Sequence, residues 1–116
     1  MNPSHDIDTG YFRAKLRAAR AELEELLAIS AKDSATVELD QTSVGRLSRM
    51  DAMQRQAMAL ETERRRLREI QRIDAALKRI EQGEYGFCVA SGEPIPVARL
   101  ELDPAAATLA LKPDDA

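Results

Sequence analysis

The chain has 116 residues and no tryptophan; 3% of its residues are aromatic and 32% are charged. Because aromatic side chains supply much of the buried area in small domains, this composition argues against a β-sandwich or a Rossmann-type sheet and favours long helices packed along a narrow seam. The net charge of −3 argues against DNA as the main partner, since phosphate binding depends on a basic excess.

Residues 1–8 are polar, and we predict that they are flexible. They lack the basic start and apolar stretch of a signal peptide, and no apolar run in the chain approaches the roughly 18 residues that span a bilayer. Cys88 is the single cysteine, so it has no partner for an internal disulfide. These features predict a cytoplasmic protein that does not bind membranes.

The first predicted helix extends from Thr9 to about Lys32. Asp8 or Thr9 is suited to cap it, since either side chain can accept a hydrogen bond from a free backbone N–H group. The apolar residues recur in steps of three and four, which is the spacing of a coiled-coil seam. They are Phe12, Leu16, Ala19, Leu23, Leu26 and then either Ile29 or Ser30.

Residues 33–43 show no helical period and are rich in Asp, Ser and Thr, which favour caps and turns. We predict that they connect two helices, with the tip of a hairpin at about residues 36–51. The second helix is expected to begin at Val44 or Ser48 and to end near Gln82, with Gly83 as its C-cap. Its apolar residues, spaced mostly by three and four, are Leu47, Met50, Met53, Ala57, Leu60, Leu67, Ile70, Ile73, Leu77 and Ile80.

Two long helices with matching stripes and one connection predict an all-α fold, a long antiparallel coiled-coil hairpin over residues 9–82. The spacing allows a register that brings Leu16 near Leu77 and Leu26 near Leu67. A hairpin of this kind has no concavity, and the sequence contains no nucleophile–base set, carboxylate pair or phosphate-binding glycine loop. We therefore expect no enzymatic activity.

The character of the sequence changes over residues 83–104, where glycines and prolines are frequent. Gly86 and Gly92 flank a predicted tight turn, a short helical turn is expected over residues 97–101, and residues 105–116 are expected to form a loose tail. The run is Gly83-Glu84-Tyr85-Gly86-Phe87-Cys88-x-x-Ser91-Gly92-Glu93-Pro94-Ile95-Pro96-x-x-Arg99-Leu100.

This run resembles the zinc-knuckle signature of the DksA/TraR family, whose members carry a helical hairpin followed by a four-cysteine knuckle. The resemblance covers residues from about 8 to 112; the knuckle segment is specific, whereas many unrelated coiled coils share the hairpin pattern. Cys88 stands at the first ligand position and Ser91 at the second, while the third and fourth fall near Leu109 and Lys112. A structural zinc ion needs four Cys or His ligands. We therefore expect no zinc in this chain.

Without zinc, the knuckle must be held by packing against the base of the hairpin. We expect Cys88 to be a small buried residue, the alternative being a redox-sensing thiol. The side chains expected to provide the packing are Tyr85, Phe87, Ile95, Val97 and Leu100.

The family resemblance implies a transcription regulator that binds RNA polymerase as a monomer, without binding DNA. Its hairpin tip is expected to enter the secondary channel and to change the lifetime of promoter open complexes. Family members carry an Asp-x-Ala element at the tip. Asp40-Gln41-Thr42 and Asp51-Ala52-Met53 both approximate it, and spacing does not decide between them. The implied tip residues are Asp40, Thr42, Ser43, Asp51 and Ala52.

Family members often act together with ppGpp, which is held partly by basic residues on the second helix and near the knuckle. Asp103 stands where a basic residue is expected, and this reversal of charge argues against ppGpp binding. The arginines of residues 64–72 cover several helix faces, so they also suit a solvated flank that pairs with acidic residues of the first helix. The implied contacts to ppGpp or polymerase are Arg65, Arg68, Arg72 and Arg99.

Two other functions agree with the same residues. A coiled-coil adaptor that self-associates or binds another protein, without a polymerase function, would leave seam residues exposed in the monomer. A nucleic-acid binder that uses the arginines of residues 64–72 would show a steep salt dependence, and the acidic composition disfavours it.

Overall fold

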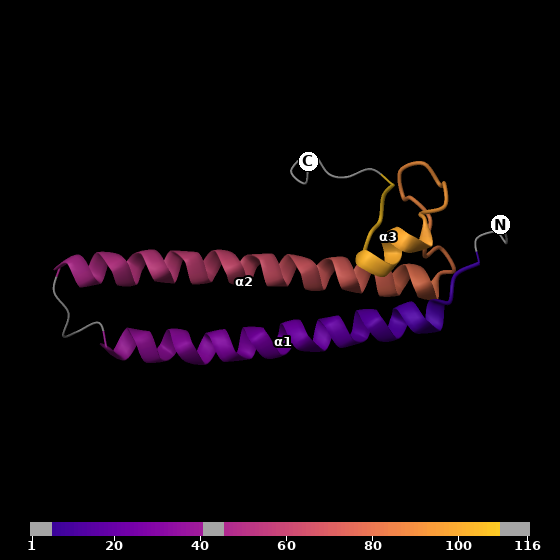
Figure 1. Cartoon of the computed structure of the whole chain (residues 1–116). Helices are drawn as coiled ribbons and strands as arrows, with labels where there is room; N and C mark the ends of the chain where they lie inside the picture. The colour runs from indigo at the N-terminus through magenta and orange to yellow at the C-terminus, as the bar shows by residue number, and fades with distance from the viewer. Residues whose placement is uncertain (1–5, 41–45, 110–116) are drawn as a thin grey trace. The chain divides into compact units, whose positions relative to one another are not determined.

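The computed structural model describes residues 6–40 and 46–109, and the side chains of these residues except 33–40, 46 and 47. Its helices are α1 (Thr9–Asp40), α2 (Arg46–Glu81) and α3 (Val97–Leu102) (Figure 1). Within the described ranges there is no strand, and a single β-bridge joins Phe87 to Pro94. The predicted all-α fold is confirmed.

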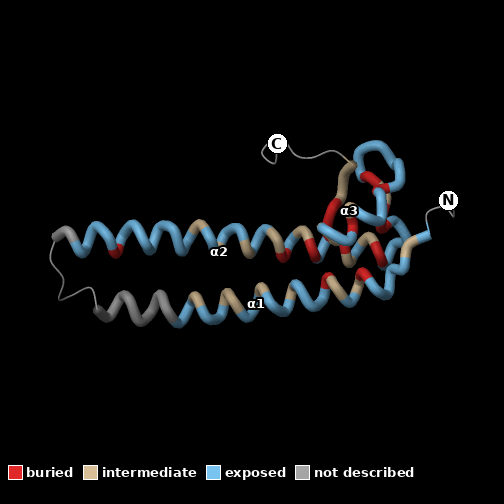
Figure 2. The backbone as a smooth tube through the Cα atoms, viewed as in Figure 1, coloured by how far each residue is buried: buried red, intermediate tan, exposed pale blue. Residues whose placement is uncertain are grey.

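The chain divides into two compact units. Unit 1 comprises residues 1–19 and 71–116, so it holds the start of α1, the end of α2 and α3, and unit 2 comprises residues 20–70. Within each unit, the segments of α1 and α2 run side by side in opposite directions (Figure 1). Most buried residues belong to unit 1, where the red segments of Figure 2 gather.

Helix α1 begins where the sequence predicts. The backbone N–H of Tyr11 donates to Asp8 Oδ1 at 3.1 Å, which makes Asp8 the N-cap. The predicted end at about Lys32 is wrong, because α1 continues to Asp40. No glycine or proline occurs between residues 11 and 44, and extending an existing helix is much easier than nucleating one, so a few Ser, Thr and Asp residues do not stop it.

Helix α2 begins at Arg46, so Ser48 lies inside its first turn and is not a cap. It ends within one residue of the prediction. The N–H of Glu84 donates to the carbonyl of Arg79 at 2.8 Å, and the N–H of Gly83 donates to that of Ile80 at 3.2 Å. These two bonds and the φ of 75° at Gly83 form a Schellman motif, which confirms the predicted C-cap.

The apolar face predicted for α2 is correct only in its second half. Ile70 and Ile73 are buried, whereas the described residues predicted for this face before them are exposed. The buried and the exposed apolar residues therefore lie on different faces of α2. Steps of seven residues from Ile73 and Ile70 toward the start of the helix lead to Arg66, Glu63 and Ala59, and not to the exposed apolar residues. The exposed residues that the sequence placed in the seam are Met50, Met53, Ala57, Leu60 and Leu67.

A contact in unit 2 shows which of the two alternative residues near the end of the α1 seam faces α2. The Arg66 guanidinium donates to the Ser30 hydroxyl at 3.1 Å, which indicates that Ser30 rather than Ile29 faces α2. Ile29 is 50% exposed.

The core of unit 1 joins the helix ends to the segment after Gly83. Phe12 of α1 lies 5.8 Å from Tyr85 between ring centroids, and Cys88 is buried as expected. Of the side chains predicted to hold this segment, Tyr85, Ile95 and Leu100 are buried, whereas Phe87 is half-buried and Val97 is 42% exposed. The largest fully buried side chains of the described residues are Phe12, Leu16, Ile73, Ile95 and Leu100.

The loose tail predicted from residue 105 is wrong for residues 105–109. Ala105 and Ala106 are each only 3% exposed, and the N–H of Val89 donates to the carbonyl of Ala107 at 2.8 Å. Small side chains and backbone bonds hold this stretch, and neither produces a recognisable sequence pattern. Residues 1–5 and 110–116, which were also predicted to be flexible, lie outside the described residues.

Candidate functional site

The predicted tip residues fall on both sides of the boundary of what the structure describes. Thr42, Ser43 and the side chain of Asp40 lie outside the described residues. Asp51 and Ala52 lie in the second turn of α2; Asp51 is exposed, whereas Ala52 is 7% exposed and packs within unit 2. The Asp51-Ala52 pair therefore presents a carboxylate to solvent from a position that its buried neighbour fixes.

The predicted arginine contacts divide between the two units. In unit 2, Arg65 and Arg68 are both exposed and lie 3.7 Å from the carboxylate of Glu61, with Arg64 at 3.6 Å from the same group. Three guanidinium groups around one carboxylate leave this part of α2 positively charged. Exposed ion pairs of this kind add little to stability, so these arginines remain able to bind an acidic partner.

In unit 1, the other two predicted arginines are bound within the protein. The guanidinium of Arg72 donates to Asp103 Oδ2 at 2.8 Å, and Nε of Arg99 donates to the carbonyl of Thr108 at 3.1 Å. Asp103 thus neutralises the charge that an anionic ligand would need at Arg72. Sequence reasoning noted the reversed charge at Asp103 and did not foresee the ion pair.

Hydrogen-bond donors surround the sulfur of Cys88. The Ser91 hydroxyl and the N–H groups of Leu109, Ser91 and Ala90 lower the pKa of its thiol from the usual 9.0 to about 7. A structural zinc ion needs four Cys or His ligands, whereas, apart from Cys88, the residues at the expected ligand positions are Ser91, Leu109 and Lys112. The residues present do not fit a structural zinc ion.

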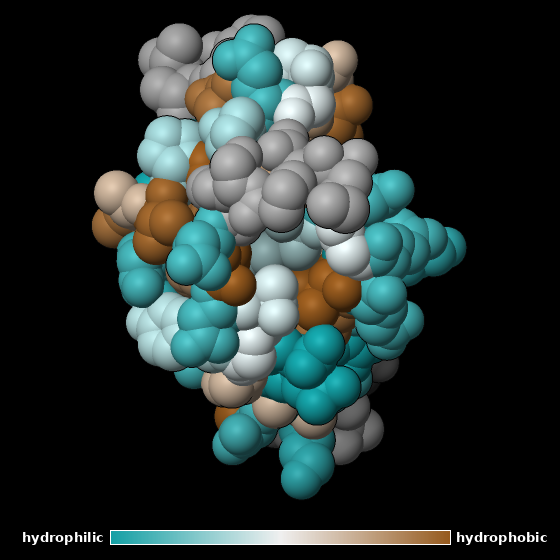
Figure 3. All heavy atoms as spheres, turned by 90° about the vertical axis from the view of Figure 1, so that its right-hand side faces the viewer, coloured by the Kyte–Doolittle hydropathy of each residue, from teal (hydrophilic) through white to brown (hydrophobic). Residues whose placement is uncertain are grey.

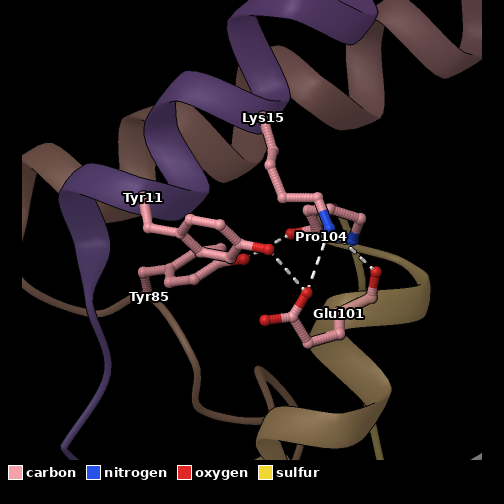
Figure 4. A network of polar contacts seen from close by, with 5 residues as sticks. All are labelled: Tyr11, Lys15, Tyr85, Glu101 and Pro104. Carbon is pink, nitrogen blue, oxygen red and sulfur yellow. Dashed lines mark hydrogen bonds and ion pairs between the residues drawn. The ribbon is translucent and has the colours of Figure 1, made fainter.

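A polar network missed by sequence reasoning joins α1 to α3 within unit 1 (Figure 4). Tyr11 donates its hydroxyl to Glu101 Oε1 at 2.8 Å, and Lys15 donates to the same carboxylate at 3.1 Å. These two hydrogen bonds lower the pKa of Glu101, and the Glu101 contact raises that of Lys15. Nearby, the Tyr85 hydroxyl donates to the carbonyl of Pro104 at 2.7 Å, and burial raises the pKa of Tyr85 to about 12.

Unit 1 also has a hollow of about 410 Å³ beside Cys88, lined by Arg79, Gly83, Glu84 and Phe87 among others. On the face of unit 1 seen in Figure 3, hydrophobic residues form separate areas among hydrophilic ones. Within the described residues, no group of three or more His, Cys, Asp or Glu side chains could hold a metal ion. The described residues that line this hollow include no histidine.

Comparison with known proteins identifies the relatives of this fold. No family model matches the chain. The RNA polymerase-binding transcription factor DksA of Caulobacter vibrioides (strain NA1000 / CB15N) is 36% identical to it over 103 residues, which cover 88% of this chain and 70% of that protein. The chain belongs to the DksA/TraR family. The DksA of a second Caulobacter vibrioides strain (ATCC 19089 / CIP 103742 / CB 15) matches equally well.

The solved structures agree with this assignment to the DksA/TraR family. Transcription factor DksA2 from Pseudomonas aeruginosa superimposes with a TM-score of 0.75 at 27% identity, covering 85% of this chain and 74% of that one. The family predicted from the knuckle segment is therefore confirmed. In the described part of the chain, no helix has the length and apolarity needed to cross a membrane.

Proposed function

We propose that this member of the DksA/TraR family binds RNA polymerase and regulates transcription. The observation that carries the proposal is Asp51, an exposed carboxylate beside the buried Ala52 near the start of α2. The similarity to a relative named for binding RNA polymerase supports the choice of partner.

The mechanism that we propose is entry of the Asp51 end of unit 2 into the secondary channel of the polymerase. The described part of this unit is two helices wide, and a helix with its side chains is only about 10–12 Å across. Such a unit can follow a narrow channel and bring a carboxylate near the catalytic centre, where it would change the lifetime of open complexes. In this role the protein is regulatory rather than catalytic.

The proposed active form is a cytoplasmic monomer that contacts polymerase and not DNA. The net charge of −3 supports the absence of direct DNA binding. We also propose that neither zinc nor ppGpp is required. Cys88 is the only cysteine of the chain and so has no second thiolate beside it, and a phosphate that approached Arg72 would have to displace the Asp103 carboxylate, 2.8 Å from its guanidinium.

The test is competition for purified RNA polymerase against a known secondary-channel factor, together with transcription from a responsive promoter. We expect mutual displacement. The substitution Asp51→Asn should leave polymerase affinity within about twofold and weaken the promoter effect about tenfold or more, since a hydrogen bond to a charged group contributes about 1.5–3 kcal/mol. Addition of ppGpp should change the affinity less than about twofold.

The matched control is Asp74→Asn, which removes an exposed carboxylate from unit 1 and should leave both measurements unchanged. Equal losses in the two variants would contradict the role of Asp51. Absence of polymerase binding in the wild-type chain would overturn the proposed function.

One observation favours the alternative of a coiled-coil adaptor without a polymerase function. Residues that the sequence placed in the seam, such as Met53 and Leu60, are exposed in the single chain. The competition experiment separates the two functions, because an adaptor would not displace a secondary-channel factor.

A further inference from the structure

An exposed stripe runs along α2 within unit 2, at positions separated alternately by three and four residues. Met53, Leu60 and Leu67 are 66%, 47% and 45% exposed, so about half or more of the surface of each is accessible to solvent. A surface helix normally turns residues at this spacing toward a core, and an exposed set indicates a contact surface. We name as the α2 stripe Met50, Met53, Ala57, Leu60, Arg64 and Leu67.

The charges around the α2 stripe define what can bind there. Arg64 lies in the stripe and Arg68 lies next to Leu67, and both are more than half exposed. Their ion pairs are long, at 3.6 and 3.7 Å, and share the single carboxylate of Glu61 with Arg65. A fitting occupant therefore presents apolar and acidic side chains at helical spacing.

Helix α1 carries such a surface in the same unit. Glu22, Glu25 and Ile29 are all exposed and follow one another at intervals of three and four residues, and we name them the α1 stripe. In the described part of the chain, neither glutamate forms an ion pair. Ile29, with half of its surface exposed, supplies the apolar end of the stripe.

The two stripes match when the helices run in opposite directions. With Ile29 of one chain opposite Leu60 of another, Glu25 comes opposite Arg64 because each step is four residues long. The next step of three brings Glu22 opposite Leu67, beside Arg68. Glu25 then lies opposite an arginine, Glu22 lies opposite a leucine with Arg68 next to it, and Ile29 lies opposite a leucine.

We propose that the α2 stripe binds the α1 stripe of a second copy of this chain. The contact joins two different surfaces, so two copies either pair reciprocally about a two-fold axis or use one contact each and add further copies. It is also short and partly built from exposed ion pairs, which indicates weak and reversible binding, with a Kd of about 10 µM to 1 mM. Self-association covers the α2 stripe, so the stripe is exposed only in the monomer.

Sedimentation velocity of the full chain over this concentration range tests the proposal. We expect the weight-average sedimentation coefficient to rise with concentration, and the rise to be smaller in high salt because screening weakens the exposed charge pairs. The double variants Arg64→Glu/Arg68→Glu and Glu22→Arg/Glu25→Arg should each weaken association about tenfold or more, since each places like charges opposite one another. An equimolar mixture of the two variants should associate again, because the charges are then complementary.

The control is Arg65→Glu, which reverses one arginine of the same helical turn outside the α2 stripe and should leave association unchanged. Recovery in the mixture also shows that the variants are folded. A wild-type chain that stays monomeric throughout the range overturns the proposal. So does a loss in Arg65→Glu as large as that in the double variants, because it would indicate general charge effects instead of matching stripes.

Discussion

The donors around Cys88 give the thiol a preference for its charged form. Its pKa of about 7 in the folded chain lies below the usual 9.0. The folded state therefore stabilises the thiolate more than the unfolded state does. A group with a lowered folded pKa contributes stability that is fully present above the unfolded pKa and is lost as the pH falls through the folded pKa. For Cys88, this window runs from about 9 down to about 7.

We therefore predict a pH-dependent effect of Cys88→Ala. The difference in melting temperature between the wild-type chain and this variant should grow as the pH rises from about 7 to about 9, as measured by circular dichroism. The variant Ser91→Ala removes the leading donor and should raise the thiol pKa, which can be followed through the ultraviolet absorbance of the thiolate. A thiol that titrates near 9 in the wild-type chain would contradict the donor arrangement.

Residue-level predictions from sequence succeeded where they depended on side-chain type alone. The burial of Cys88 could be anticipated because its side chain is small and apolar. The reversed charge at Asp103 could be anticipated because the sign of a side chain's charge is given by the residue type. The ion pair from Arg72 to Asp103 and the network around Glu101 could not. Both join residues far apart in the chain, and only the fold determines which surface charges meet.

At the scale of elements, the two phases of α2 are the main structural feature. Apolar residues occur along most of the helix, but the seam in unit 2 passes through Arg66 and Glu63, both half-buried, while Leu60 and Leu67 stay exposed. A list of apolar spacings of three and four does not reveal this change of face. The steps from Arg64 to Leu67 and from Leu67 to Ile70 are both three residues long, and two such steps in succession move the pattern to another face of the helix.

A pair of truncations in α2 tests this difference in phase. Ile70 is 9% exposed and Leu67 is 45% exposed, three residues apart in unit 2. We expect Ile70→Ala to lower the free energy of unfolding by about 2 kcal/mol or more, because it empties a buried site. Leu67→Ala should change it by less than about 0.5 kcal/mol. Chemical denaturation of both variants measures this, and equal losses would place Leu67 in the seam after all.

The lengths of the helices show a second limit of prediction at this scale. The N-cap of α1 follows from Asp8, whose side chain accepts a local hydrogen bond. The C-terminal Schellman motif of α2 follows from Gly83, which has no side chain to oppose a positive φ. The end of α1 could not be predicted in the same way. Weak helix formers after Lys32 lower the helix propensity only slightly, and no breaker stops the chain before Gly45.

At the scale of the whole molecule, we propose that the stability of the fold depends on packing rather than on a metal ion. The buried side chains of unit 1 include Phe12, Tyr85, Ile95 and Leu100, which join the helices to the segment that follows them. Where a zinc ion holds a small domain, its binding supplies about 10–16 kcal/mol of folding free energy, so its removal unfolds the domain.

We predict that removal of metal leaves this protein folded. A strong chelator should change the melting temperature by less than about 2 °C and should leave the helical circular dichroism unchanged, and metal analysis of the purified protein should find much less than one zinc per chain. A relative with four knuckle cysteines serves as the positive control. A large fall in melting temperature of the present chain would show that a metal ion holds it.

The segment after Asp103 has a consequence for how freely the sequence can vary. Four of its carbonyl groups accept hydrogen bonds. The carbonyl of Pro104 accepts from the Tyr85 hydroxyl and that of Ala106 from Arg79. The carbonyl of Ala107 accepts from the Val89 N–H and that of Thr108 from Arg99. Every amino acid offers a carbonyl oxygen, so these bonds impose no side-chain identity on the accepting positions. Evolution can therefore replace the half-buried Ala107 and Thr108 more easily than the buried alanines, and much more easily than a metal ligand, for which few amino acids can substitute.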